Sequence, residues 1–210
     1  MKRIEHNEEK WVFPFVEYSP EETTKAPLPL IIQLHGAGER GSGGDELSLV
    51  DVHGFSKTVT SQNQSCIIVM PQCPKDTFWA ARVESIISFI EALKNSFNVD
   101  ENRIYLTGLS MGGYGTWYTA MARPDLFAAI APVCGGGMAW NADVLNMPVW
   151  AFHGVCDPTV SVTQSDEMVA ALEAHGKNVM YSRLVGVGHN AWDYAYNGEL
   201  LSWLLTQKKK

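Results

Sequence analysis

The feature that most constrains this chain is a regular alternation of short apolar runs with longer amphipathic stretches. The apolar runs are rich in Ile, Val, Leu and Ala, as is typical of strands buried on both faces of a parallel sheet. Strands are therefore predicted over 28–34, 65–70, 103–107, 127–133, 148–152 and 179–185. The segment 11–18 alternates aromatic residues with others and suits a strand near one edge, which Pro14 weakens.

Helical patterns fill the stretches between these runs. The segment 81–97 carries apolar side chains at three- and four-residue spacing. Further helices are expected over 112–122, 163–175 and 199–206. Strands that alternate with helices predict βαβ units, and so an α/β fold with a mainly parallel central sheet flanked by helices.

Length and composition favour one globular domain. The chain has 210 residues, no internal repeat and no linker-like stretch, so we expect a single α/β domain over 1–210. Within it we expect a polar N-terminal segment over 1–10 and a basic tail over 207–210. Hydrophobic residues make up 46% and charged residues 19%, which is too apolar for a disordered chain.

The same composition argues against several classes of partner. The net charge is −7, whereas a general nucleic-acid binder usually has a basic surface. No stretch of 18 apolar residues exists, so no membrane span is expected. The polar start lacks the apolar core of a signal peptide, which predicts a cytoplasmic protein. A secreted protein whose signal has been removed would look the same.

The four cysteines show no CxxC pair, and no His/Cys/Asp cluster has metal-ligand spacing. We therefore expect buried free thiols, no metal site and no cofactor.

The strongest chemical signal is the segment GLSMGG at 108–113, between a predicted strand and a predicted helix. G-x-S-x-G in that setting is the nucleophile elbow, a turn so tight that the positions two before and two after the serine must lack bulky side chains. The hydroxyl of Ser110 then stands at a helix N-terminus, where backbone N–H groups favour developing negative charge. We predict that Ser110 is the nucleophile.

An acid and a base follow at later strand ends, where active sites of parallel sheets lie. Asp157 follows the run 148–152, and His189 lies in a Gly-rich loop after the last predicted strand. The order Ser, Asp, His is that of the α/β-hydrolase triad, in which the histidine deprotonates the serine and the carboxylate orients the histidine. Asp193 is the alternative carboxylate.

The other histidines have simpler interpretations. His35 and His153 each precede a glycine at a strand end, which favours a structural hydrogen-bonding role. His53 lies in a loop, where substrate contact stays open.

Acyl transfer also needs hydrogen-bond donors for the oxyanion. One is the backbone N–H of Met111, the residue after the nucleophile. The other is expected from the glycine-rich loop HGAG at 35–38, with Ala37 as the first choice and Gly38 as the alternative.

These motifs together resemble the phospholipase/carboxylesterase and dienelactone-hydrolase-like branch of the α/β-hydrolases, especially small bacterial esterases labelled predicted peptidases. The carrying motifs are HGAGERG at 35–41, PQCP at 71–74, GLSMGG at 108–113, HGVCDPTV at 153–160 and GVGHNAWDYAY at 186–196. The resemblance implies an α/β-hydrolase fold, a triad of Ser110, Asp157 and His189, and an oxyanion hole at Ala37 and Met111. We expect no lid or cap domain, because the stretch 134–147 is too short to form one.

The expected function is a serine carboxylesterase that hydrolyses short- to medium-chain acyl esters and needs no cofactor. Trp79, Trp140 and Trp192 follow strand ends and either pack locally or form an aromatic-walled cleft for a sugar or an aromatic acyl group. The cleft would suit a feruloyl or acetyl esterase acting on plant polysaccharide fragments. A thioesterase, lysophospholipase or peptidase would use the same triad. From another class, a non-catalytic ligand-binding module stays open, because one fold hosts many functions.

Overall fold

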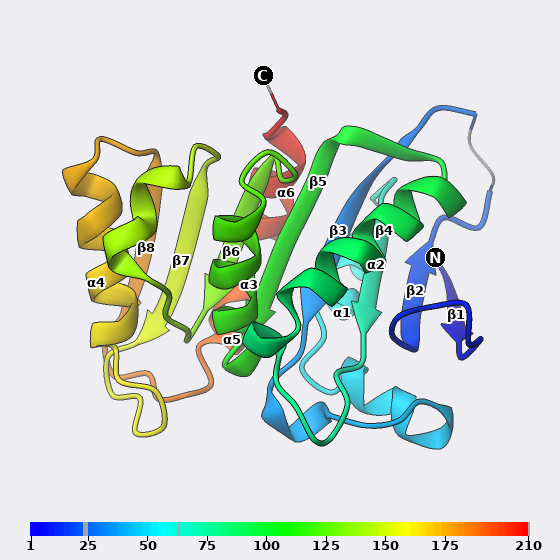
Figure 1. Cartoon of the computed structure of the whole chain (residues 1–210), viewed down its shortest axis with the longest axis horizontal. Coiled ribbons are helices and arrows are strands. Elements are labelled where there is room, and N and C mark those ends of the chain that lie inside the picture. The colour runs from blue at the N-terminus through cyan, green and yellow to red at the C-terminus, as the bar shows by residue number, and fades with distance from the viewer. Residues whose placement is uncertain (23–24, 63, 210) are drawn as a thin grey trace.

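The computed structural model describes residues 1–22, 25–62 and 64–209, and in these parts of the chain eight strands form one sheet (Figure 1). The strands lie in the order β1-β2-β4-β3-β5-β6-β7-β8. The first two strands pair antiparallel with each other, β2 pairs antiparallel with β4, and the remaining pairs are parallel. The bounds are β1 Lys2–His6, β2 Phe15–Ser19, β3 Leu28–Leu34, β4 Ile67–Pro71, β5 Val99–Leu109, β6 Ala129–Val133, β7 Val149–Gly154 and β8 Val179–Leu184.

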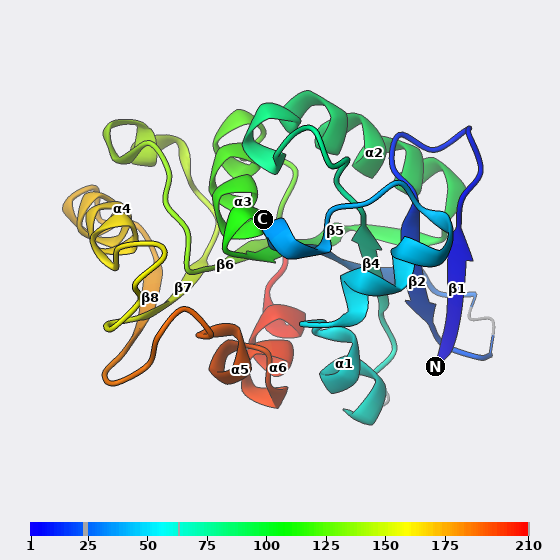
Figure 2. The same cartoon turned by 90° about the horizontal axis from the view of Figure 1, so that it is seen from below.

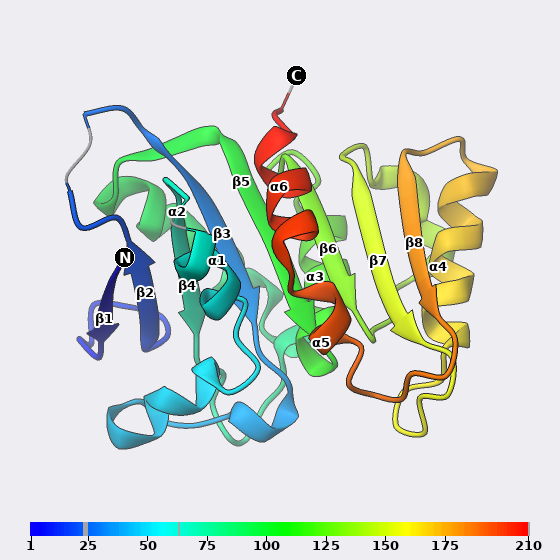
Figure 3. The same cartoon turned by 180° about the vertical axis from the view of Figure 1, so that it is seen from behind.

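Helices cover both faces of the sheet (Figure 2). One face carries α2, α3 and α4, and the other carries α1, α5 and α6, which lie in front of the sheet in Figure 3. Their bounds are α1 Ser56–Gln62, α2 Val83–Ser96, α3 Met111–Ala122, α4 Thr163–Ala174, α5 Trp192–Ala195 and α6 Gly198–Thr206. Short 3₁₀ helices lie at Ala37–Glu39, Gly44–Asp51, Trp79–Ala81 and Ala139–Val144. Among the described helices, none combines the length and apolarity that a membrane crossing needs.

The two faces give two hydrophobic cores, and the central strands contribute to both. In β3, the side chains of Leu30 and Ile32 belong to the core under α2 and α3, whereas Ile31 belongs to the core under α1 and α6. Because successive side chains of a strand point to opposite faces, a strand covered on both sides needs a continuous apolar run. This confirms the predicted α/β class with its mainly parallel, helix-flanked sheet.

The N-terminal edge of the sheet differs from the sequence prediction. The polar segment over 1–10 contains β1, and the strand expected over 11–18 begins only at Phe15. β1 is set by its pairing with β2 and by the ring of His6, which stacks on Phe15 with centroids 4.2 Å apart. Its alternating exposed residues carry no continuous apolar signal, since one face is solvated. Helix α1 was also not predicted, because its sequence SKTVTSQ buries only Ser56 and Val59.

Buried polar side chains fix the loops at the carboxyl edge of the sheet. The Nδ1 of His35 lies 2.6 Å from the carbonyl oxygen of Gly36, and its Nε2 accepts the backbone N–H of Cys73 at 2.9 Å. A carbonyl only accepts, so the ring is neutral with its proton on Nδ1. The imidazole thus ties the loop after β3 to the loop after β4, which is the structural role expected for His35.

Helix α3 crosses β3 and β5 at a distance that only glycine permits. A Cβ on Gly112 would overlap the carbonyl oxygen of Leu34, and a Cβ on Gly108 would overlap the carbonyl oxygen of Gly112. Backbone atoms block both positions, so no rotamer change relieves the overlap. The closeness of this crossing therefore requires both glycines of the G-x-S-x-G segment.

We predict that Gly112→Ala lowers the free energy of unfolding by about 2 kcal/mol or more, because overpacking a rigid site is costly. Helix propensity alone predicts the opposite sign, a gain of about 1 kcal/mol for Gly to Ala. Urea denaturation decides between them. Gly38→Ala is the matched control, since a Cβ there meets nothing within 4 Å, and a change within about 0.5 kcal/mol is expected. Equal stabilities of both variants and the parent would contradict the packing argument.

We also predict acid destabilisation through His35. Burial lowers the pKa of His35 to about 4. At pH values below the ordinary histidine pKa of about 6.5, His35 binds a proton in the unfolded chain but not in the folded chain. The free energy of unfolding therefore falls as the pH drops from about 6.5 to about 4, and then levels off. The loss is roughly 3 kcal/mol, at about 1.4 kcal/mol per pKa unit. Denaturation at several pH values should show a shallower slope in this window for His35→Gln, whose amide oxygen can accept from Cys73. The same slope in both proteins would contradict the assignment.

Candidate active site

Ser110 sits at the turn between β5 and α3 in a strained conformation. Its φ is 53°, in the left-handed region that side chains with a Cβ rarely adopt. The turn is held by the Ser110 N–H, which donates to Val133 on β6 at 2.9 Å, and by the Ser110 carbonyl, which accepts from Tyr114 at 3.1 Å. Such strain persists only where the surroundings fix it, and it directs the hydroxyl out at the N-terminus of α3.

The three predicted triad side chains form one hydrogen-bonded row. Nε2 of His189 lies 2.9 Å from Oγ of Ser110, and Nδ1 lies 2.7 Å from Oδ2 of Asp157. Asp157 comes from the loop after β7, and His189 from the loop between β8 and α5. A carboxylate only accepts, so the proton sits on Nδ1 and leaves Nε2 able to accept from the serine hydroxyl.

The side chain of Asp157 is fully buried yet stays ionised. Burial by itself raises the pKa of a carboxyl group, but the hydrogen bonds from His189 and from the backbone N–H groups of Val160 and Thr159 outweigh it and hold the pKa of Asp157 below its usual range. The two N–H groups both reach Oδ1, at 2.9 and 2.8 Å. The alternative carboxylate, Asp193, is exposed and accepts from Asn190 at 2.9 Å instead.

The loop predicted to supply an oxyanion donor lies beside the serine. A Cβ built on Gly36 would stand 3.8 Å from Cβ of Ser110. Within the described residues, the backbone N–H groups of Ala37 and Met111 donate to no group of the chain. Arg40 braces the loop, because its Nε donates to the Ala37 carbonyl at 2.9 Å. Gly38 is exposed and leaves room for a substrate.

The three tryptophans considered for the cleft have different positions. Trp79 is 0% exposed, and its indole N–H donates to the His35 carbonyl at 3.0 Å, so it is a core residue and not a cleft wall. Trp140 is 80% exposed and lies outside the lining of the cavity beside Met111, so the structure gives no support to its predicted role. Trp192 alone contacts the row, with its ring edge against His189 at a centroid distance of 5.3 Å.

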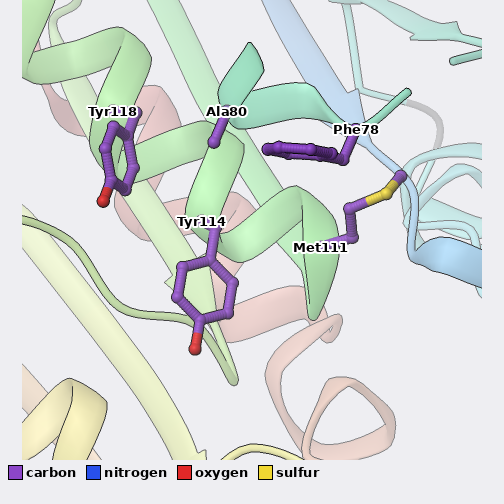
Figure 4. Close-up of a pocket in the computed structure, with 5 residues that line it drawn as sticks. All are labelled: Phe78, Ala80, Met111, Tyr114 and Tyr118. Atoms are coloured by element: carbon purple, nitrogen blue, oxygen red, sulfur yellow. The ribbon is translucent and has the colours of Figure 1, made fainter.

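A cavity of about 390 Å³ opens beside Met111, and its other lining residues were not singled out by the sequence analysis (Figure 4). Its lining consists of Phe78, Ala80, Met111, Tyr114 and Tyr118. The two tyrosines lie four residues apart on α3 and so share one helix face. That spacing was the available sequence signal, but it does not distinguish a cavity wall from a core face.

One group in the described part of the chain has metal-ligand geometry. The ligand atoms of Cys134, Asp157 and His189 lie within 4.8 Å of one another. Burial raises the pKa of the Cys134 thiol to about 12, and its Sγ lies 3.2 Å from the His189 carbonyl oxygen. A cysteine binds a metal ion as the thiolate, which this high pKa disfavours. The side chains of Asp157 and His189 already bind each other. These residues therefore do not fit a metal ion.

Comparison with known proteins shows that this chain is similar to hydrolases. The sequence profile of the prolyl oligopeptidase family matches residues 80–140, which include the serine turn. A bifunctional acetylxylan esterase/xylanase, XynS20E of Neocallimastix patriciarum, is 30% identical over 60% of this chain and 18% of its own length. A probable feruloyl esterase C of Aspergillus terreus is 29% identical over 66% of this chain and 52% of its own length.

Among solved structures, a thermostable esterase superposes with a TM-score of 0.87 and 32% identity, covering 99% of this chain and 63% of that protein. The chain thus spans less than two thirds of each of these three relatives. The sheet, the strained serine turn and these relatives together show that this chain belongs to the α/β-hydrolase superfamily.

Proposed function

We propose that this protein is a serine carboxylesterase for short- to medium-chain acyl esters. The observation that supports this most is the row from Ser110 through His189 to Asp157, with 2.9 and 2.7 Å contacts. Serine is a poor nucleophile near neutral pH and needs a histidine that removes its proton. The row supplies that base, already in the required tautomer.

The proposed reaction proceeds in two halves. His189 Nε2 takes the proton of the Ser110 hydroxyl while Oγ bonds to the acyl carbon, and the N–H groups of Ala37 and Met111 stabilise the oxyanion. The bond to the alcohol oxygen then breaks as His189 gives that oxygen its proton. Water attacks the acyl-enzyme, His189 takes one water proton, and the acid leaves as the proton returns to Ser110.

The cavity beside Met111 favours one second candidate, an esterase for aromatic acyl groups. Met111 also carries a proposed oxyanion donor, so this cavity lies next to the proposed position of the reacting carbonyl. Three aromatic rings line the cavity, and rings of this kind pack well against a planar acyl group. Two relatives are named as acetylxylan and feruloyl esterases. The same row of Ser110, His189 and Asp157 could also act on thioesters and peptides, which are the remaining candidate substrates.

We predict that Ser110→Ala lowers kcat/KM on p-nitrophenyl esters by at least about 10⁴-fold, because the residues of a triad act as a unit. Asp157→Asn should cause a loss of about the same order, since it changes the tautomer of His189. Asp193→Asn is the matched control and should retain activity, because its side chain is exposed.

Stopped assays on esters from acetate to palmitate, together with labelling by a fluorophosphonate, provide the readout. Ester turnover that survives in Ser110→Ala would overturn the proposal. Labelling of the parent without turnover of any ester would move the activity to thioesters or peptides, and absence of both would favour a ligand-binding module.

For the aromatic acyl candidate, we predict that Phe78→Ala lowers kcat/KM on methyl ferulate by about tenfold, the value of one lost aromatic contact. Hydrolysis of p-nitrophenyl acetate should change less than about threefold, since an acetyl group does not reach the ring. Phe78 is 54% exposed, so truncation should leave the core intact. Trp140→Ala, at 80% exposure, is the control and should affect neither ester. A loss of equal size on both esters would contradict the assignment.

A further inference from the structure

We propose that His153 is a positioning residue for the reaction, which holds Asp157 in the orientation that His189 requires. This inference rests on the proposed function of the row. His153 is the penultimate residue of β7, is 0% exposed and takes no part in the proposed chemical steps. A buried imidazole needs partners for both ring nitrogens, and those partners show what this one does.

The Nε2 of His153 faces only acceptors. It lies 3.0 Å from the carbonyl oxygen of Val160 and 3.3 Å from Oδ2 of Asp157. Neither oxygen can donate, so Nε2 carries a proton. Oδ2 is also the oxygen that binds His189, so the two imidazole rings approach the same carboxylate oxygen, one at 2.7 Å and the other at 3.3 Å.

The hydrogen bond to Val160 closes the turn around the carboxylate. The carbonyl of Val160 accepts from His153, and the N–H of the same residue donates to Oδ1 of Asp157 at 2.9 Å. Thr159 donates to that oxygen at 2.8 Å. If Nε2–H were lost, Val160 would lose its link to β7, and the far side of the turn, with its two N–H donors, would be less firmly held around the carboxylate.

The other side of the ring packs against α4 and holds the imidazole itself in the core. Nδ1 of His153 lies 2.7 Å from Oγ of Ser165 on α4, and that hydroxyl donates to the carbonyl of Gly135 at 2.9 Å. Gly135 packs against the first turn of α3, since a Cβ there would press on Gly113 and Tyr114. His153 therefore lies between the loop that carries the acid and the elbow that carries the nucleophile.

Two amide variants of His153 separate the role of Nε2 from the role of Nδ1. Gln places its amide near Nε2 and can still donate to Val160, whereas Asn reaches only as far as Nδ1 and keeps the contact with Ser165. We expect His153→Asn to lower kcat about tenfold or more with KM unchanged, as a small misplacement of a catalytic group does. His153→Gln should stay within about threefold of the parent.

Ser165→Ala is the matched control, because it removes the Nδ1 contact and spares Nε2. It should lower the melting temperature and leave kcat within about threefold. A second readout is the downfield proton NMR signal of His189 Nδ1–H, which needs a fixed Asp157 and no substrate. We expect the signal in the parent, His153→Gln and Ser165→Ala, and its broadening or loss in His153→Asn.

Equal kcat and an equal signal in the Asn and Gln variants would overturn the proposal, and so would a kcat loss as large in Ser165→Ala. Failure of the proposed function is visible separately. The parent would then hydrolyse no ester and resist the fluorophosphonate, whereas the NMR comparison would still show whether His153 orders Asp157.

Discussion

The close approach of α3 to β3 is the contact on which the rest of the site depends. Gly112 stands against the carbonyl of Leu34, and only hydrogen occupies the place of a Cβ. This approach brings the N-terminus of α3, the strained Ser110 and the loop 35–38 to one point at the carboxyl edge of the sheet. A helix set farther out would separate the Met111 N–H from the Ala37 N–H, the two groups that we propose as oxyanion donors.

The acid side of the site depends on a different constraint, the cost of burying charge. An unpaired buried carboxylate is strongly disfavoured, and each polar partner must itself be satisfied. Asp157 meets this requirement with two backbone N–H groups and the imidazole of His189, while a second imidazole, His153, lies at ion-pair distance. The sequence HGVCDPTV supplies nearly the whole arrangement within eight residues, since His153, Thr159 and Val160 all belong to it.

The parts of the molecule that could be predicted are those governed by local pattern. Apolar runs identified the central strands, because strands covered on both faces leave a continuous signal in one dimension. The row of Ser110, Asp157 and His189 followed from the strand ends, where parallel topology brings distant residues together. β1 and α1 lacked such signals: β1 forms through pairing with β2, and α1 buries only two small side chains. Trp79 shows the same limit, because its place after a strand says nothing about whether its ring faces solvent or the core.

The residues of the hydrogen-bonded row and the residues that line the cavity beside Met111 lie in different environments. In the proposed mechanism, backbone groups and buried side chains hold the reacting atoms: the side chains of Asp157 and His153 are fully buried, and the proposed oxyanion donors are main-chain N–H groups. The cavity that we propose for the acyl group is instead bordered by Phe78, which is 54% exposed, and by tyrosines on the outer face of α3. Substitution of Phe78 is expected to cost little stability, since exposed positions contribute little to the core. Acyl preference can therefore change at this rim while the buried centre, and with it the reaction, stays the same.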